Sequence, residues 1–181
     1  MRFSRSSLIR TAALTAVTAG VAALYGCAVS VPKGIKPVPG FDAKRYMGTW
    51  YELARIEHNF EKGLSQVTAQ YSLNDDGTVT VVNRGYDAAK SEWRQATGKA
   101  RFLSDSKVAA LKVSFFGPFY GGYNVVSLDD QYQTSLVIGD SLDYFWLLSR
   151  SNSIPEQQFR QLLEKAQSFG VDLSKVQVVS Q

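Results

Sequence analysis

The stretch that decides the fold is Met47-Gly48-Thr49-Trp50-Tyr51-Glu52-Leu53-Ala54-Arg55-Ile56. Gly48 gives the backbone room to pass against a bulky neighbour, and Trp50 is large enough to close one end of a small barrel. Successive side chains of a strand point to opposite faces, so one face is predicted to carry Trp50, Glu52, Ala54 and Ile56. Taken alone, the stretch fits an ordinary first strand with a core tryptophan equally well.

Length and charge exclude several classes of protein. The chain has 181 residues, enough for one domain with a real core, and a formal net charge of +4. Residues 1–26 contain three arginines and no acidic residue, which leaves a net charge of +1 for the rest. Lys and Arg are then scattered among Asp and Glu, unlike the basic stripe of a nucleic-acid-binding protein. Cys27 is the only cysteine, so no intramolecular disulfide can form.

Residues 1–26 have the pattern of a secretory signal peptide, because arginines precede an apolar segment that is too short to span a bilayer. The segment ends Leu24-Tyr25-Gly26-Cys27, which resembles a bacterial lipobox and predicts cleavage before Cys27 and lipidation of its thiol. An ordinary signal peptide with a stray cysteine is the alternative. Ala28 follows instead of aspartate, and in the bacterial sorting pattern this predicts the outer membrane.

Residues 27–40 are rich in Pro and Gly and are predicted to form a semi-extended tether between the lipid and a barrel domain at residues 41–181. The segment 41–47 is predicted to form one short turn of helix before the first strand.

Beyond Leu64, short alternating segments are separated by turn residues such as Asn74-Asp75-Asp76-Gly77. Besides the first strand, strands are predicted at 64–73, 78–86, 92–102, 109–116, 120–128, 134–139 and 143–150. Eight strands with no helix between them favour an antiparallel meander. Such a meander can close into a barrel, which removes exposed edges and can hold one small ligand.

One helix is predicted after the eighth strand. Ser153-Ile154-Pro155-Glu156 has the spacing of a capping box with Pro in the first turn, and Gly170 is a natural stop. The helix is predicted to lie outside the barrel on an apolar stripe of Phe159, Leu162, Leu163 and Ala166. A short final strand is predicted at Val176–Val178.

With these residues the chain resembles a lipocalin, most closely the bacterial outer-membrane type. Gly48-Thr49-Trp50 matches the first motif of that family. The segment Tyr123 to Asp129, a strand that ends in aspartate before a turn, is similar to the second motif, and Arg150 at the end of the eighth strand matches the third. The order and spacing of the three motifs, with a helix after the third, make the resemblance specific over residues 40 to 179.

The resemblance implies an all-β, eight-stranded antiparallel up-and-down barrel, open at one end, with an apolar cavity and one C-terminal helix outside. It implies that Trp50 closes the floor and Arg150 packs across it, so Gly48, Trp50, Asp129 and Arg150 are expected to be structural residues. It further implies a fatty acid or lysophospholipid as ligand and a role in cell-envelope maintenance. The expected location is an outer membrane lipid anchor of a Gram-negative bacterium, facing the periplasm; a homodimer is left open.

An enzyme is the weaker interpretation. His58 is the only histidine, and no second His or free Cys is present to build a metal site or a thiol base. No Gly-x-Ser-x-Gly elbow occurs, and no cofactor or metal is expected. Glu52 is interpreted as an inward floor carboxylate paired with Arg84 or Lys99.

The alternative function is a tethered envelope interaction module with no small-molecule ligand. Its cavity would be filled by its own side chains, and the aromatic run from Phe115 to Tyr123 would bind a partner or a second copy.

Alternation along the strands predicts the side chains that line the cavity and contact the ligand. They are Ala54, Ile56, Ala69, Tyr71, Phe102, Val113, Phe115, Asn124, Val126, Tyr144, Trp146 and Leu148. A register slip of one residue reverses any of these assignments. The third strand is apolar on both faces, so alternation gives no prediction for it.

Overall fold

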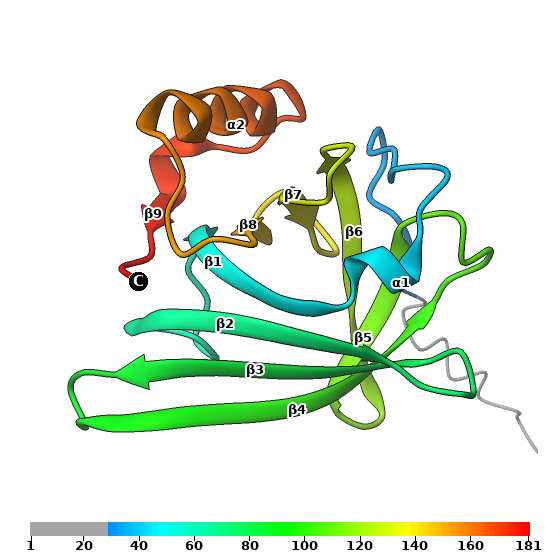
Figure 1. Ribbon diagram of the computed structural model, residues 1–181, viewed down its shortest axis with the longest axis horizontal. Helices are drawn as coiled ribbons and strands as arrows, with labels where there is room; N and C mark the ends of the chain where they lie inside the picture. Colours follow the sequence, from blue (N-terminus) through cyan, green and yellow to red (C-terminus); the bar gives the residue numbers. More distant parts are fainter. Residues whose placement is uncertain (1–28) are drawn as a thin grey trace, which may run out of the picture.

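The computed structural model describes residues 29–181, which form a closed antiparallel barrel with one long helix outside it (Figure 1). The elements are α1 (Ala43–Tyr46), β1 (Gly48–Ile56), β2 (Leu64–Leu73), β3 (Val79–Asp87), β4 (Glu92–Phe102), β5 (Ala110–Phe116), β6 (Phe119–Leu128), β7 (Thr134–Ile138), β8 (Phe145–Ser149), α2 (Glu156–Ser168), a 3₁₀ turn (Leu173–Lys175) and β9 (Val176–Val178). Within residues 29–181, no helix has the length and apolar character needed to cross a membrane.

Strand β1 closes the barrel. The sheet order is β2-β3-β4-β5-β6-β7-β8-β1-β9, and an additional pairing of β1 with β2 joins the two sides. The first half of β1 pairs with β2, with Trp50 opposite Ala69, and its second half pairs with β8 and β9. The predicted eight-stranded barrel with an external helix is therefore confirmed, and β9 extends the sheet beside β1.

The eighth strand is two residues shorter at its start than the predicted 143–150, because the chain turns at residues 140–144 before it enters β8. The other strands begin and end within one residue of the predicted bounds.

Up-and-down topology places the connecting loops at two ends. Residues 57–63, 88–91, 117–118 and 139–144 lie at one end, and α1 lies at the other with the loops 74–78, 103–109 and 129–133.

The apolar side chains form two clusters on the two sides of the barrel wall. The inner cluster, which includes Trp50, Tyr71, Val81 and Leu111, fills part of the interior. The outer cluster lies between the wall and α2, which Figure 1 shows above β7 and β8. The predicted stripe of Phe159, Leu162, Leu163 and Ala166 packs into this outer cluster.

The capping box predicted for α2 is absent. Pro155 is the N-cap and Glu156 the first helical residue, and in the described part of the chain no side-chain hydrogen bond caps the helix start. Ser153 therefore stands two residues before the N-cap, out of the position from which its hydroxyl would reach the N3 amide. Gly170 has φ +97°, and α2 ends at Ser168 as that glycine predicts.

The floor of the barrel is built on the contact between Trp50 and Arg150. Trp50 is fully buried, and its indole N–H donates to the carbonyl of Tyr46 at 2.8 Å. The Arg150 guanidinium lies 3.9 Å from the centre of the Trp50 ring, which is the contact the resemblance implies. Gly48 has φ +94°, a backbone conformation that favours glycine.

Asp129 holds the turn beside the floor. Its carboxylate accepts backbone N–H groups from Gln131, Gln133 and Thr134, so it fixes the chain between β6 and β7. This role is structural.

Candidate ligand-binding site

The barrel encloses a cavity of about 440 Å³, within the range of roughly 300–1,000 Å³ typical of ligand pockets. Its walls are mostly apolar and include Val67, Val79, Val81, Ala100 and Leu111. Trp50, Tyr46 and Phe41 are buried at the α1 end, so that end is closed.

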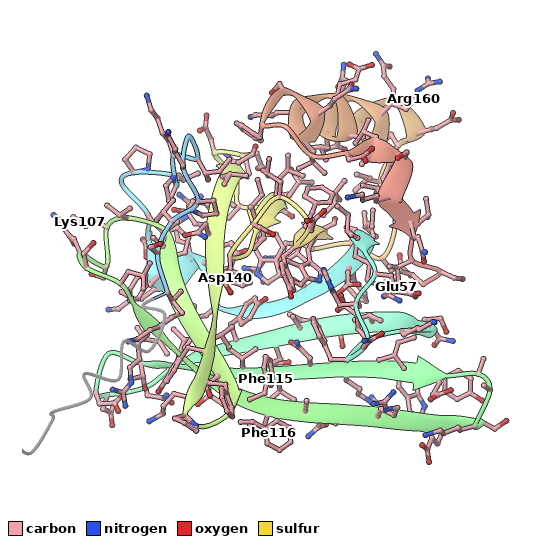
Figure 2. The ribbon with its side chains drawn as sticks, turned by 180° about the vertical axis from the view of Figure 1, so that it is seen from behind. Glu57, Lys107, Phe115, Phe116, Asp140 and Arg160 are labelled. Carbon is pink, nitrogen blue, oxygen red and sulfur yellow. The ribbon has the colours of Figure 1, made fainter. Side chains whose placement is uncertain are left out.

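At the opposite end the lining residues are exposed. Five aromatic side chains form this mouth, namely Phe60, Phe116, Phe119, Tyr120 and Tyr144. Phe116 is 82% exposed and Phe119 77%, at the tip of the β5–β6 hairpin, which crosses β4 in Figure 2. The cavity is therefore an apolar pocket that opens through an aromatic rim.

Eight of the twelve side chains predicted to face the cavity line it. They are Ala69, Tyr71, Phe102, Val113, Phe115, Tyr144, Trp146 and Leu148. Contact of these residues with a ligand remains a prediction.

The prediction for Ala54 and Ile56 is wrong. Both lie in the outer cluster beneath α2. The register of β1 against β8 shifts between Glu52 and Ala54, which is a β-bulge. A bulge inserts one extra residue and reverses the alternation that follows it.

The prediction of Asn124 and Val126 as inward residues of β6 is also wrong, because the residues that alternate with them face the interior. Tyr123 lines the cavity and Val125 belongs to the inner cluster, whereas Val126 lies in the outer cluster. Asn124 is buried in the wall, where its amide donates to the carbonyls of Ile138 and Gly139 at 3.1 Å each.

The bulge turns Arg55 toward the interior. Its guanidinium donates to Glu52 at 2.9 Å, and the two side chains are 4% and 8% exposed. It also donates to the carbonyls of Glu61 and Leu64 at 3.1 Å each. Glu52 does face the cavity as predicted, but its partner is Arg55.

The partners predicted for Glu52 lie elsewhere. Arg84 stacks on Trp93 at 3.9 Å, and Lys99 pairs with Asp76 at 3.3 Å. Both face solvent on the β3–β4 side.

Glu61, in the loop after β1, is a second carboxylate in the cavity that sequence reasoning missed. Glu61 is only 7% exposed, and both of its carboxylate oxygens accept from the indole N–H of Trp146 at 3.3 Å. Burial, followed by the negative charge of Glu52, raises the pKa of Glu61 to about 8. A loop residue gives no periodic signal, so alternation could not have found it.

Three tyrosines add a polar band to the lower wall. The Tyr46 hydroxyl is 2.9 Å from that of Tyr123 and 3.0 Å from Ser135 Oγ, and the Tyr71 hydroxyl is 3.0 Å from that of Tyr123. Burial raises the pKa of Tyr46 to about 12, so these hydroxyls are neutral at physiological pH.

His58 supports the mouth. Its ring stacks on Tyr144 with centroids 3.9 Å apart, and its Nε2 is 2.9 Å from the carbonyl oxygen of Asp143. Over the described part of the chain, no group of three or more His, Cys, Asp or Glu side chains is placed to hold a metal ion.

A family described as a lipocalin-like domain matches residues 41–181. The chain belongs to the lipocalin family. It is 49% identical over 168 residues to the outer membrane lipoprotein Blc of Citrobacter freundii, covering 93% of this chain and 95% of that protein. It is also 37% identical to temperature-induced lipocalin-1 of Arabidopsis thaliana, covering 80% and 81% of the two chains.

Solved structures agree on the fold. Insecticyanin from the tobacco hornworm Manduca sexta superposes with a TM-score of 0.64 at 18% identity, covering 81% of this chain and 84% of that one. A major allergen from cockroaches gives a TM-score of 0.63 at 21% identity, covering 81% and 92%.

The bacterial relatives are named outer membrane lipoproteins and include the Escherichia coli protein, 49% identical over 162 residues. The outer-membrane location predicted from the leader is thereby confirmed. Cys27 lies outside the described residues, and its lipidation remains a prediction, as do the signal peptide and tether boundaries.

Proposed function

We propose that the chain is a non-enzymatic carrier that holds one acyl chain, of a fatty acid or a lysophospholipid, in the barrel cavity. The observation that carries this proposal is the apolar pocket of about 440 Å³, closed by Trp50 and open through an aromatic rim. The lipocalin family supports a small hydrophobic ligand in general.

Burial of an acyl chain supplies enough free energy for binding in the micromolar range or weaker. Each CH₂ group removed from water contributes about 0.8 kcal/mol, so about ten would gross roughly 8 kcal/mol before ordering costs. That gross value corresponds to a dissociation constant of about 1 μM, and ordering costs weaken it.

The proposed setting is the periplasmic face of the outer membrane, with Cys27 lipidated and the residues after it as the tether, which ends where Val38 exchanges backbone hydrogen bonds with Val125 and Ala109 of the barrel. A carrier held there would store or move single-chain lipids during envelope maintenance. Stable anchoring takes more than one acyl chain, which lipoprotein modification supplies.

Lipid extraction tests the carrier directly. Protein purified from the bacterial envelope without delipidation is expected to release one single-chain lipid per chain in mass spectrometry. The same preparation of Ala69→Trp, whose added ring fills the cavity, is the matched control and is expected to release far less. Equal lipid from both proteins would show that the lipid comes from the surface and would contradict the proposal.

The interaction module remains a second candidate because of one observation. Phe116 and Phe119 are largely exposed at the hairpin tip, and such apolar patches mark interaction sites in many proteins. Those residues also belong to the cavity rim, so a ligand entering the barrel accounts for them equally.

A further inference from the structure

The charged side chains that line the cavity all have the same sign. Among the described residues they are Glu52, Glu61 and Asp140, and no Lys, Arg or His belongs to the lining. An ionised lipid head group inside the cavity therefore meets carboxylates as its only charged lining groups in the described chain, although Lys112 lies over the ring of the rim residue Tyr120 at 5.0 Å and His58 stacks on Tyr144.

Two of these carboxylates have their charge compensated. Glu52 is paired with Arg55, whose guanidinium reaches it from the wall at 2.9 Å. Asp140 is exposed to water at the mouth and accepts the backbone N–H of Gly122 at 2.9 Å; Figure 2 shows it beside β6. Neither needs a ligand to be stable.

Glu61 is different because it is buried without an ion-pair partner among the described residues. In the described chain, no Lys, Arg or His nitrogen lies within 4 Å of its carboxylate. Its one donor is the neutral indole of Trp146, at the long distance of 3.3 Å. The Arg55 guanidinium donates to the backbone carbonyl of Glu61 but forms no ion pair with its carboxylate, so its charge only partly opposes the rise in the pKa of Glu61. A buried carboxylate in this state is costly unless a cation or a proton compensates it.

The position of Glu61 suits a head group. Its neighbour Phe60 is 58% exposed at the mouth, whereas Trp146 and the side chains below Glu61 line the apolar interior. An acyl chain packed in the interior would therefore bring its polar end to the level of this carboxylate.

We propose that Glu61 is the head-group receptor of the cavity, and that it selects single-chain lipids with an ammonium group over those that end in a bare carboxylate. This inference rests on the proposed carrier function and narrows it. An ammonium group beside Glu61 supplies the missing counter-charge in a site of low dielectric. A ligand carboxylate in the same place meets a like charge and binds only when Glu61 is protonated.

The two ligand classes are expected to respond oppositely to pH. Without a ligand, burial and the negative charges of Glu52 and Glu57 raise the pKa of Glu61, whereas the charge of Arg55 and the hydrogen bond from Trp146 lower it. The net pKa is about 8, so Glu61 is protonated below that pH. Binding of a cation releases that proton, so affinity rises with pH from 6 to 9. Binding of an anion retains the proton, so affinity falls over the same range.

The test compares three probes with the same twelve-carbon chain. Dodecyltrimethylammonium and dodecanoate keep opposite charges from pH 6 to 9, and monododecanoylglycerol is neutral. Wild-type protein at pH 8.5 is expected to bind the ammonium probe at least tenfold more tightly than dodecanoate, measured by calorimetry below the micelle concentrations.

The variant Glu61→Gln keeps the shape and the acceptor for Trp146 but removes the charge. It is expected to lose most of the tenfold preference and the pH dependence, so that the ratio of its affinities for the ammonium probe and dodecanoate approaches one at pH 8.5 whatever its affinity for the neutral probe. Glu57→Gln removes a carboxylate from the same loop that does not line the cavity, and it is expected to keep the preference.

The outcomes separate the two proposals. If wild type binds the neutral probe but shows no charge preference and no opposite pH slopes, the head-group inference is overturned and the carrier stands. If none of the three probes binds saturably, the carrier fails and the inference fails with it. The wild-type pH slopes need no variant, so a Glu61→Gln protein that does not fold leaves the test intact.

Discussion

Arg150→Lys is expected to destabilise the barrel although it conserves the charge. The Arg150 guanidinium donates to five backbone carbonyls, those of Arg45, Tyr46, Met47, Thr49 and Tyr132, at 2.8–3.3 Å. It also stacks on Trp50. A lysine ammonium has three N–H donors and no planar face, so at least two carbonyls lose their donor and the stacking is lost.

The size of the effect follows from these contacts. A hydrogen bond to a charged group contributes about 1.5–3 kcal/mol, and stacking of a guanidinium on an indole about 0.5–2 kcal/mol. Several of the carbonyls are near solvent, so water replaces part of the loss. We therefore expect Arg150→Lys to lower the free energy of unfolding by about 2–3 kcal/mol.

The assay is urea unfolding followed by far-ultraviolet circular dichroism, with the free energy obtained by linear extrapolation. Arg160→Lys is the matched control, because Arg160 lies on the exposed face of α2 and its one ion pair within residues 29–181 is with Glu156 at 3.4 Å (Figure 2). That variant is expected to stay within about 0.5 kcal/mol of wild type. An Arg150→Lys protein as stable as the Arg160→Lys control would refute the role given to the planar Arg150 guanidinium and its several N–H donors.

Three further predictions follow from the leader, the cavity and the buried carboxylate. Cys27→Ser is expected to move the protein from the outer membrane to the soluble periplasmic fraction; continued membrane fractionation, with no labelled fatty acid in wild type, would contradict lipidation. Ala69→Trp should weaken binding of a neutral acyl probe at least tenfold, measured by calorimetry, while Gln95→Trp, at an exposed site on the outward face of β4, leaves it unchanged. Glu61→Gln should gain stability over wild type as pH rises from about 4.5 to about 8, because the folded chain holds a proton that the unfolded chain releases in that window; equal urea midpoint differences at pH 5 and pH 8 would argue against a raised pKa.

Alternation and turn chemistry predicted the extents of most strands because polar and apolar residues separate cleanly along them. They also placed α2, whose stripe matches the helical period. Seven of the eight correct cavity residues lie on stretches of strand where alternate side chains face the cavity, and the eighth, Tyr144, lies in the turn just before β8.

The errors have a local cause in the sequence. Leu53 and Ala54 are both apolar, so nothing in the pattern reveals the β-bulge between Glu52 and Ala54 that turns Arg55 inward. Val125 and Val126 are likewise both apolar, so the parity of β6 could be set either way. Glu61 reaches the cavity only through the tertiary path of its loop, which no periodicity records.

The central claim, that the barrel cavity holds one acyl chain, is tested most directly by fluorescence titration of delipidated protein. Trp146 lines the cavity, whereas Trp50 lies fully buried in the floor and Trp93 on the outer hairpin is 46% exposed. The titrants are a monoacylglycerol, a fatty acid and a lysophospholipid, so that binding of an acyl chain is detected whichever head group the site prefers. We predict a saturable change with a dissociation constant below about 100 μM, roughly −5.5 kcal/mol, for at least one of them, and loss of most of that signal in Trp146→Phe. Absence of saturable binding for all three, in protein that remains folded, would contradict the carrier and favour the interaction module.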